Sequence, residues 1–199
     1  MYRSYPSLVI GFHGCDEKTA EALVSGRSTF KPSRNDHDWL GSGMYFWENN
    51  PERAKEYAAE RIKRQKSKAK PAVVGAVLHL GHCFNLLEKY HIDNLSAAYY
   101  MLRETFELSG RKIPENELGK DKLLRHLDCA VIELHHYWNE KQLELPPYDS
   151  VRGVFQEGGE AYPGSGFMKK SHIQLAIRNP NCIKGFFWPR SLDTSYTRP

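Results

Sequence analysis

The hydrophobic positions along the chain follow two periods, which predict strands near both ends and helices between them. Short apolar or aromatic runs typical of strands cover residues 8–12, 44–47, 72–80, 150–155, 172–178 and 182–187. Apolar residues at helical spacing predict helices over residues 17–25, from residue 51 onward, around 95–106 and around 124–138. We therefore predict an α+β fold with mostly antiparallel strands, built as one domain over residues 1–199 with a helical insertion at about 91–143.

Helix-capping residues and glycines predict where several of these elements begin and end. Asp16 is expected to cap the first helix, and Gly26 to end it. Asn50 and Pro51 have the residue types of an N-cap and a first turn, and Pro71 is expected to end that second helix. Residues 27–39 and the glycine-rich residues 156–171 are predicted to be loops.

Composition narrows the class of protein only slightly. The 199 residues carry a formal net charge of +4, which permits an anionic ligand without requiring one. The four cysteines form no Cys-x-x-Cys pair, which favours reduced thiols over a disulfide framework. Apolar runs stay far below the roughly 20 residues that cross a bilayer, and the N-terminus lacks the apolar core of a signal peptide. We therefore expect a cytoplasmic protein without a membrane partner.

Three motifs follow one another in a characteristic order. Phe12-His-Gly-Cys15 ends the first predicted strand, Leu40-Gly-Ser-Gly-Met-Tyr-Phe-Trp-Glu48 precedes the second helix, and Tyr57 lies on that helix. Together with the late strand around Gln174, this order resembles the catalytic domain of poly(ADP-ribose) polymerases and diphtheria-toxin-like ADP-ribosyltransferases. The resemblance covers about residues 8–62 and resumes after residue 150. It implies split antiparallel sheets with flanking helices.

The resemblance implies an NAD-dependent enzyme that cleaves the nicotinamide–ribose bond and transfers ADP-ribose. It assigns His13 to a ribose hydroxyl and the backbone of Gly14 to the nicotinamide amide. Tyr45 and Tyr57 would enclose the nicotinamide ring, whose positive charge is attracted to an aromatic face. Arg27 is a candidate for the diphosphate. NAD would be a substrate, and the acceptor an unidentified protein or nucleic acid.

The sequence departs from the family pattern at the position of the catalytic glutamate. Gln174 stands there, and an amide brings no negative charge to an oxocarbenium-like transition state. This departure favours transfer of single ADP-ribose units, with Glu157 as the candidate carboxylate that meets the developing charge and Glu160 as a weaker one. Ala54 replaces a serine that binds nicotinamide in the polymerases.

Other functions and sites remain as alternatives. An NAD glycohydrolase, a catalytically silent NAD-binding module and an RNA 2′-phosphotransferase use related folds. We expect no metal site, because neither of two groups of potential ligands has a spacing that converges on one point. The first group is His79, His82 and Cys83, and the second is His126, Cys129, His135 and His136. The basic run at residues 61–70 is interpreted as a solvated helix face, with guidance of an anionic acceptor as the alternative.

Overall fold

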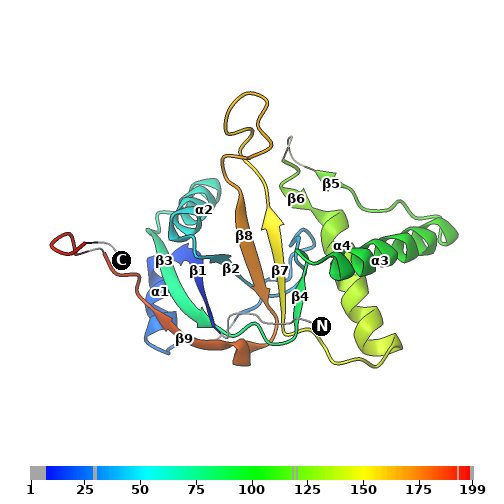
Figure 1. The fold of residues 1–199 in the computed structure, drawn as a ribbon, viewed down its shortest axis with the longest axis horizontal. Coiled ribbons are helices and arrows are strands. Elements are labelled where there is room, and N and C mark those ends of the chain that lie inside the picture. Colours follow the sequence, from blue (N-terminus) through cyan, green and yellow to red (C-terminus); the bar gives the residue numbers. More distant parts are fainter. Residues whose placement is uncertain (1–7, 29–30, 118, 120, 192, 198–199) are drawn as a thin grey trace.

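One mixed β-sheet with helices on both sides forms the body of the protein (Figure 1). The structure is a computed structural model and describes residues 8–28, 31–117, 119, 121–191 and 193–197. The strands are β1 (Val9–Asp16), β2 (Met44–Glu48), β3 (Pro71–Leu78), β4 (Cys83–Asn85), β7 (Ser150–Phe155), β8 (His172–Ile177) and β9 (Ile183–Phe187), in the spatial order β4-β7-β8-β2-β1-β3-β9. A separate antiparallel pair joins β5 (Asn116–Glu117) to β6 (Leu124–Arg125). The prediction of an α+β fold is confirmed.

The sheet is antiparallel except for β4 and β7, which run parallel. The two neighbouring strands with the fewest paired residues, β2 and β1, lie near the middle of the sheet. β1 pairs with β3 along its whole length, but only Gly11 and Phe12 pair with β2. The structure therefore has one seven-stranded sheet with a two-residue join, where split sheets were expected.

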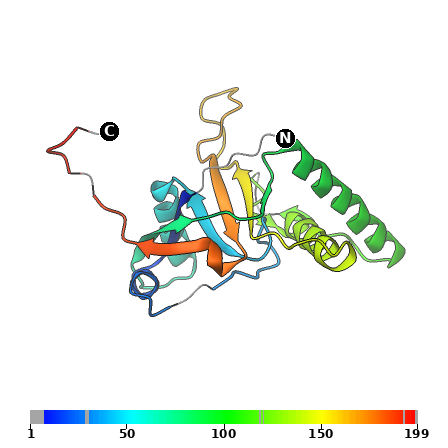
Figure 2. The ribbon, with the colours of Figure 1, turned by 60° about the horizontal axis from the view of Figure 1, so that its bottom comes forward.

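The helices divide between the two halves of the sheet. They are α1 (Glu17–Val24), α2 (Pro51–Arg64), α3 (Lys89–Leu108) and α4 (His126–Tyr137), and α4 continues into a π-helical turn, Trp138–Gln142. Figures 1 and 2 both show α1 and α2 beside the half that holds β1, β3 and β9. In the same views α3 and α4 pack together beyond β4, in the segment expected to form a helical insertion, although α3 begins at Lys89, before residue 91. The 156–171 loop projects from the top of β7 and β8.

Two apolar clusters follow from the alternation of side chains along the central strands. Phe46 and Leu78 belong to a cluster that includes Ala20 and Leu23 of α1. The second cluster contains Leu40, Phe84, Ile132, Tyr148, Val151 and Ala176, and Tyr45 packs against it. Because successive strand residues point to opposite faces, β2 contributes Phe46 to one cluster and Tyr45 to the other.

Several expected boundaries are corrected by the structure. The first strand does not end at Phe12 but continues through His13 and Gly14 to Asp16, because β3 supplies a partner for every residue. α2 ends at Arg64, and Pro71 begins β3 rather than ending the helix. Strands β4, β5 and β6 were not predicted, since each is only two or three residues long. β4 forms by pairing with the distant β7, and β5 and β6 pair with each other.

The caps of the first two helices agree with the sequence. The Asp16 side chain accepts a hydrogen bond from the backbone N–H of Thr19 at 2.9 Å, and the Asn50 side chain accepts one from Arg53 at the same distance. These bonds satisfy N–H groups that have no partner within the first turn of a helix. Both predicted starts are confirmed.

α2 packs on β1 with almost no space between the two backbones. A Cβ atom at Gly14 would lie 2.1 Å from the backbone oxygen of Ala54, and Ala54 and Ala58 of α2 are buried. The helix can come this close only because glycine faces small residues. The packing fixes α2, and with it Tyr57, against the strand that carries His13.

We expect Gly14→Ala to lower the free energy of unfolding, because the added methyl group would collide with backbone rather than with a flexible side chain. Overpacking of this kind typically costs about 1–3 kcal/mol. Gly185→Ala is a matched control, since its Cβ would meet nothing within 4 Å. Urea unfolding of both variants measures the difference, and equal midpoints for the two variants would contradict the close packing of α2 on β1.

Candidate active site

The candidate site begins where β1 and β2 separate. Beyond Phe12, no residue of β1 from His13 to Asp16 has a register partner on β2 among the described residues. Met44–Trp47 of β2 pair with β8 on the other edge of the strand. We call this unpaired stretch, between residues 13–16 of β1 and residues 44–46 of β2, the β1–β2 notch. Strand edges in such an opening present backbone N–H and C=O groups that a ligand can use.

His13 lies in the notch and is held in one tautomer. Its Nδ1 is 2.8 Å from the backbone oxygen of Tyr45. A carbonyl only accepts, so Nδ1 carries the hydrogen and Nε2 keeps a lone pair. Burial lowers the pKa of His13, the bond to Tyr45 opposes this effect, and the charge of Arg61 adds to the lowering. His13 is therefore a neutral imidazole whose Nε2 can accept a hydrogen bond from a hydroxyl group.

Tyr57 lies on the face of α2 that covers this region. Its ring packs on Trp47 with 4.8 Å between centroids and 44° between planes. Tyr57 follows Ala54, the residue in contact with Gly14, by one helical turn. The contact of Ala54 with Gly14 and the contact of Tyr57 with Trp47 thus place α2 against both β1, which carries His13, and β2.

Tyr45 holds the glycine turn that precedes β2. Its hydroxyl donates to the oxygen of Gly41 and accepts from the N–H of Leu40, both at 2.9 Å. Burial raises the pKa of Tyr45 well above its ordinary value, so the phenol stays neutral. Gly41 has φ of +73°, a conformation that favours glycine. The role of Tyr45 as a wall of a nicotinamide slot stays a prediction.

Gln174 occupies a cross-strand row with Phe12, Trp47 and Gly153. Trp47 is in register with Phe12 on one side and Gln174 on the other, and Gln174 is in register with Gly153. The indole N–H of Trp39 donates to Oε1 of Gln174 at 2.6 Å. An indole nitrogen can only donate, which orients the amide so that its NH₂ group points elsewhere. Gln174 is buried. Its amide therefore offers N–H donors, not an acceptor, to a neighbouring ligand.

Two buried polar atoms in this region lack a partner. Nε1 of Trp47 and Nε2 of His172 each have less than 1 Å² of exposed area and make no hydrogen bond to any described residue. The rings of Trp47 and His172 are 6.1 Å apart. Nδ1 of His172 lies 2.6 Å from the oxygen of Lys170, so its Nε2 is an acceptor, whereas Nε1 of Trp47 is a donor. Unpaired buried groups are costly and therefore mark places where a ligand or an ordered water binds.

Glu157 is tied to α2 by a buried ion pair. Nε of Arg53 donates to Oε1 of Glu157 at 2.9 Å, and a second guanidinium nitrogen contacts the same oxygen. Arg53 also lies 3.4 Å from Glu56 and 3.8 Å from Glu60. Both contacts to Glu157 end on Oε1, which leaves Oε2 as the atom available to a substrate. The sequence did not indicate Arg53, because an arginine on a charged helix has no pattern that predicts burial.

Arg27 stands apart from the other candidate residues. It is exposed after α1, and its Nε donates to the hydroxyl of Ser25 at 2.9 Å. Among the described residues, no contact joins it to the notch or to Gln174. Its role toward the diphosphate therefore stays a prediction without structural support.

The histidines of α4 separate into two groups. His135 stacks on Phe84 at 4.3 Å between centroids, and burial lowers the pKa of His135 to about 4. His136 lies near the same ring, and burial also lowers its pKa. Both are neutral packing residues. His126, at the start of α4, instead lies near Asp36 in the loop before β2.

A groove next to Gln174 leads outward between α3, α4 and β7. Its volume is about 460 Å³, and Trp39 and Gly153 belong to its lining together with Tyr99 and Tyr100 of α3. Gly153 lies directly beneath Trp39, with 2.8 Å between the indole and an ideal Cβ position. Trp39 therefore connects this groove to the Gln174 amide.

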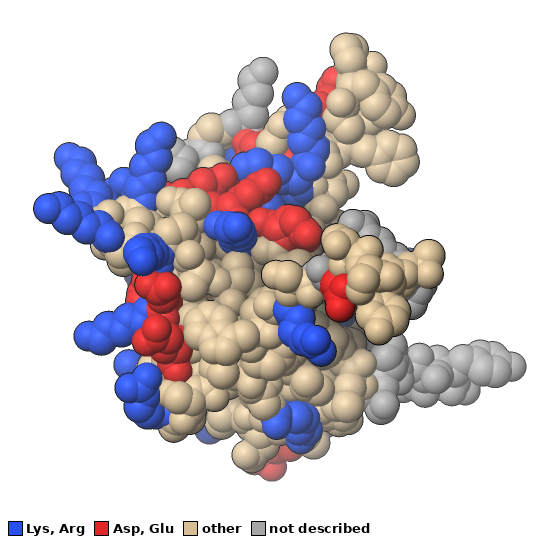
Figure 3. Space-filling view, turned by 90° about the vertical axis from the view of Figure 1, so that its left-hand side faces the viewer, with Lys and Arg blue, Asp and Glu red and all other residues tan. Residues whose placement is uncertain are grey.

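Basic side chains on the face that carries α2 are dispersed. Figure 3 shows Lys and Arg in separate groups with Asp and Glu between them. Arg61, Lys63 and Arg64 end α2, where positive charge is favoured by the helix dipole. This is the arrangement of a solvated face, and acceptor guidance by residues 61–70 stays a hypothesis.

Comparison with known proteins leaves the family open. The chain is 23% identical over 192 residues to the uncharacterized protein MJ0359 of Methanocaldococcus jannaschii, and the aligned part covers 89% of this chain and 85% of that protein. No family model and no solved structure matches the chain. In the described part of the chain, no helix combines the length and apolar character that a bilayer crossing requires.

We expect Glu157→Gln to destabilise the fold, because it removes the buried charge that faces Arg53. Breaking a buried ion pair from one side typically costs about 3–5 kcal/mol. Glu160→Gln in the same loop is the control, since Glu160 is exposed and its loss should cost under about 1 kcal/mol. Chemical denaturation measures both values, and similar stabilities for the two variants would show that the Arg53–Glu157 pair does not fasten α2 to the loop.

Proposed function

We propose that this chain is an NAD-dependent mono-ADP-ribosyltransferase whose substrate binds in the β1–β2 notch. The observation that carries the proposal is the separation of β1 from β2 at His13 and Gly14, beside the aromatic pair Trp47–Tyr57. It leaves an unpaired backbone edge at the notch, with the His13 imidazole near Phe46 and the Tyr57 ring packed on Trp47. A nicotinamide riboside group needs these three: an amide partner, a hydroxyl partner and a flat surface for a cationic ring.

Each residue would have one role toward the substrate. The backbone of Gly14 would pair with the carboxamide, and Nε2 of His13 would accept a hydrogen bond from a ribose hydroxyl. Tyr57 would lie against the nicotinamide ring. The NH₂ group of Gln174 would donate to a ribose oxygen, since Trp39 occupies its Oε1.

The reaction breaks the bond between C1′ of the ribose and the nicotinamide nitrogen, and the electron pair leaves with nicotinamide. A nucleophilic atom of the acceptor then forms the new bond to C1′ and loses its proton. Glu157 could receive this proton or face the developing charge only through Oε2, because Arg53 occupies Oε1. Its direct part in the chemistry stays a prediction.

The orientation of Gln174 also supports a second candidate, a silent module that binds NAD without cleaving it. A neutral amide that points its donors inward cannot stabilise an oxocarbenium ion. One preorganised group of the right charge typically contributes about 2.7–4 kcal/mol to a transition state. An NAD glycohydrolase would need the same stabilisation, with water as the acceptor.

Binding and turnover distinguish these candidates. We expect the parent protein to bind NAD in calorimetry and to label a macromolecule in a cell lysate supplied with labelled NAD. His13→Ala and Tyr57→Ala should weaken binding, with the aromatic contact worth about 0.5–2 kcal/mol, or about two- to thirtyfold in Kd.

Tyr90→Ala is the control for these variants, because Tyr90 is an exposed tyrosine at the start of α3. Thermal melting should show that all variants remain folded. Parent-like NAD affinity in both His13→Ala and Tyr57→Ala would remove NAD from the notch. Binding without any cleavage would support the silent module instead.

Gln174→Glu should increase NAD cleavage in the parent framework. The new carboxylate would keep the hydrogen bond from Trp39 and add the negative charge that the transition state lacks, for a gain of up to about a hundred- to a thousandfold in turnover. Gln156→Glu adds the same charge at an exposed position and should leave the rate unchanged. A rate equal to the parent in folded Gln174→Glu would show that residue 174 does not face C1′ of the ribose.

A further inference from the structure

Three side chains that can bind a metal meet on the surface between the loop before β2 and the start of α4. Asp36 and His37 come from the loop, and His126 is the first residue of α4. Nδ1 of His37 is 3.1 Å and Nδ1 of His126 is 3.5 Å from Oδ1 of Asp36. One ligand atom from each residue lies within 4.8 Å of those of the other two. We call these residues the Asp36 cluster.

The spacing of these atoms matches a shared metal ion. Zinc holds imidazole nitrogen and carboxylate oxygen at about 2.0–2.2 Å, which places neighbouring ligand atoms about 3–4 Å apart. The two distances to Asp36 fall in that range, and the remaining pair of ligand atoms lies within 4.8 Å. Two of the residues are adjacent in a loop and the third is about 90 positions away in the sequence, which is why spacing alone did not predict the site.

The ligand types select the kind of metal. Magnesium and calcium prefer sites built from oxygen atoms, whereas imidazole favours zinc and its transition-metal neighbours. Two imidazoles with one carboxylate provide three ligands and leave a fourth position for water. Asp36 is exposed, and a pocket of about 360 Å³ borders it and His126.

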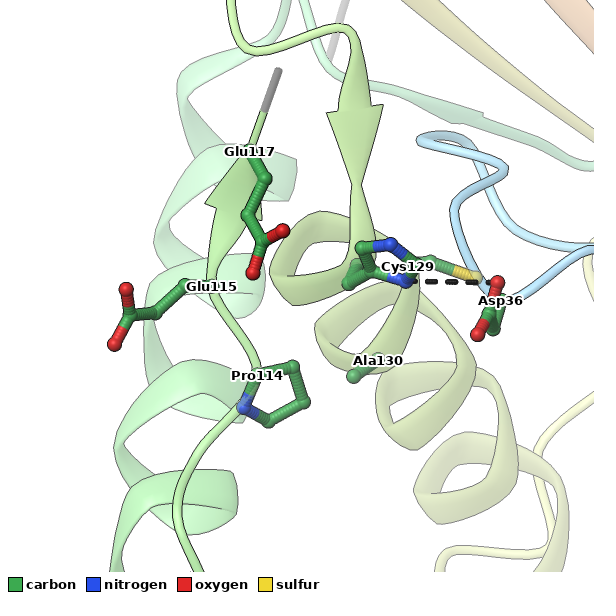
Figure 4. A pocket seen from close by; sticks show the side chains of 7 residues that line it. Asp36, Pro114, Glu115, Glu117, Cys129 and Ala130 are labelled. Atoms are coloured by element: carbon green, nitrogen blue, oxygen red, sulfur yellow. Dashed lines mark ion pairs between the residues drawn. The ribbon is translucent and has the colours of Figure 1, made fainter.

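The surroundings of the Asp36 cluster are also suited to a cation. Figure 4 shows Cys129 beside Asp36, with Glu115 and Glu117 on the segment across the pocket. The described residues that line this pocket include three carboxylates and no lysine or arginine. Lys112, outside the lining, forms an ion pair with Glu115 at 2.9 Å, so the charge that favours a cation over an anionic ligand comes from Asp36 and Glu117.

We propose that Asp36, His37 and His126 bind one Zn²⁺ ion, contrary to the expectation of no metal. The ion would join the loop before β2 to α4. The same loop carries Trp39, which donates to Gln174, and the turn at Leu40 and Gly41 that Tyr45 holds. Zinc would therefore stiffen the segment that orients the Gln174 amide. The proposal does not depend on NAD, since none of its ligands belongs to the notch.

Titration of the purified, metal-free chain tests this site directly. We expect one Zn²⁺ to bind per chain in calorimetry, and Co²⁺ to give the visible absorption of a low-coordinate site. Zinc should also raise the Tm, because it binds the folded arrangement in preference to the unfolded chain. His37→Ala and His126→Ala should each weaken binding by at least about tenfold.

His79→Ala is the matched control, because His79 is an exposed histidine outside the Asp36 cluster, and it should bind zinc like the parent. Asp36→Asn keeps the size of the side chain and should also weaken binding, which guards against a fold defect in a single variant. Absence of stoichiometric binding in the parent, or equal binding in the His37, His126 and His79 variants, would overturn the proposal. In that case the Asp36 cluster would be an ion-pair network without a metal.

Discussion

Trp47 couples the two halves of the sheet, and the positions of Gln174 and Tyr57 follow from that coupling. It is buried in β2, in register with Phe12 of β1 and with Gln174 of β8. β1 and β2 share only two pairs, so the backbone ladder alone is a weak connection at this point. The large indole compensates by packing on Tyr57 of α2 and near His172 of β8. Burial of an aromatic side chain of this size is among the larger single contributions to a core.

The short pairing between β1 and β2 leaves backbone groups without partners, and neighbouring contacts hold this region in place. Where the strands separate, backbone groups of β1 lose the partners that a continuous sheet would give them. The His13 side chain donates to the backbone oxygen of Tyr45 across the notch, which gives a partner to one group of the β2 edge. α2 packs on β1 through the contact of Ala54 with Gly14. The Arg53–Glu157 ion pair holds the same helix to the residues that follow β7. Incomplete pairing of this kind, held in place by its surroundings, is typical of ligand sites.

The loop before β2 connects the notch to the helical part of the chain. Tyr45 holds its last turn, Trp39 reaches from it to Gln174, and Asp36 faces His126 of α4. Glu133 of α4 adds a contact, since its carboxylate accepts from the N–H of Ser42. The orientation of the Gln174 amide therefore depends on a segment whose contacts lie on two different parts of the fold. A ligand that orders this loop, such as the proposed zinc ion, would act on the site through Trp39.

The sequence by itself determined the elements whose signals are local. Periodicity placed the long helices and most strands, and Asp16 and Asn50 marked two helix starts, because a cap depends on residues within one turn. The order of His13, Tyr45, Tyr57 and Gln174 was also visible in the sequence, although not their contacts. Only the tertiary structure decided the pairing of β4 with β7, the partner of Glu157, the hydrogen bond from Trp39 to Gln174 and the meeting of Asp36 with His126. Each of these joins residues more than 60 positions apart, and such contacts depend on how the whole chain packs rather than on any pattern within one segment.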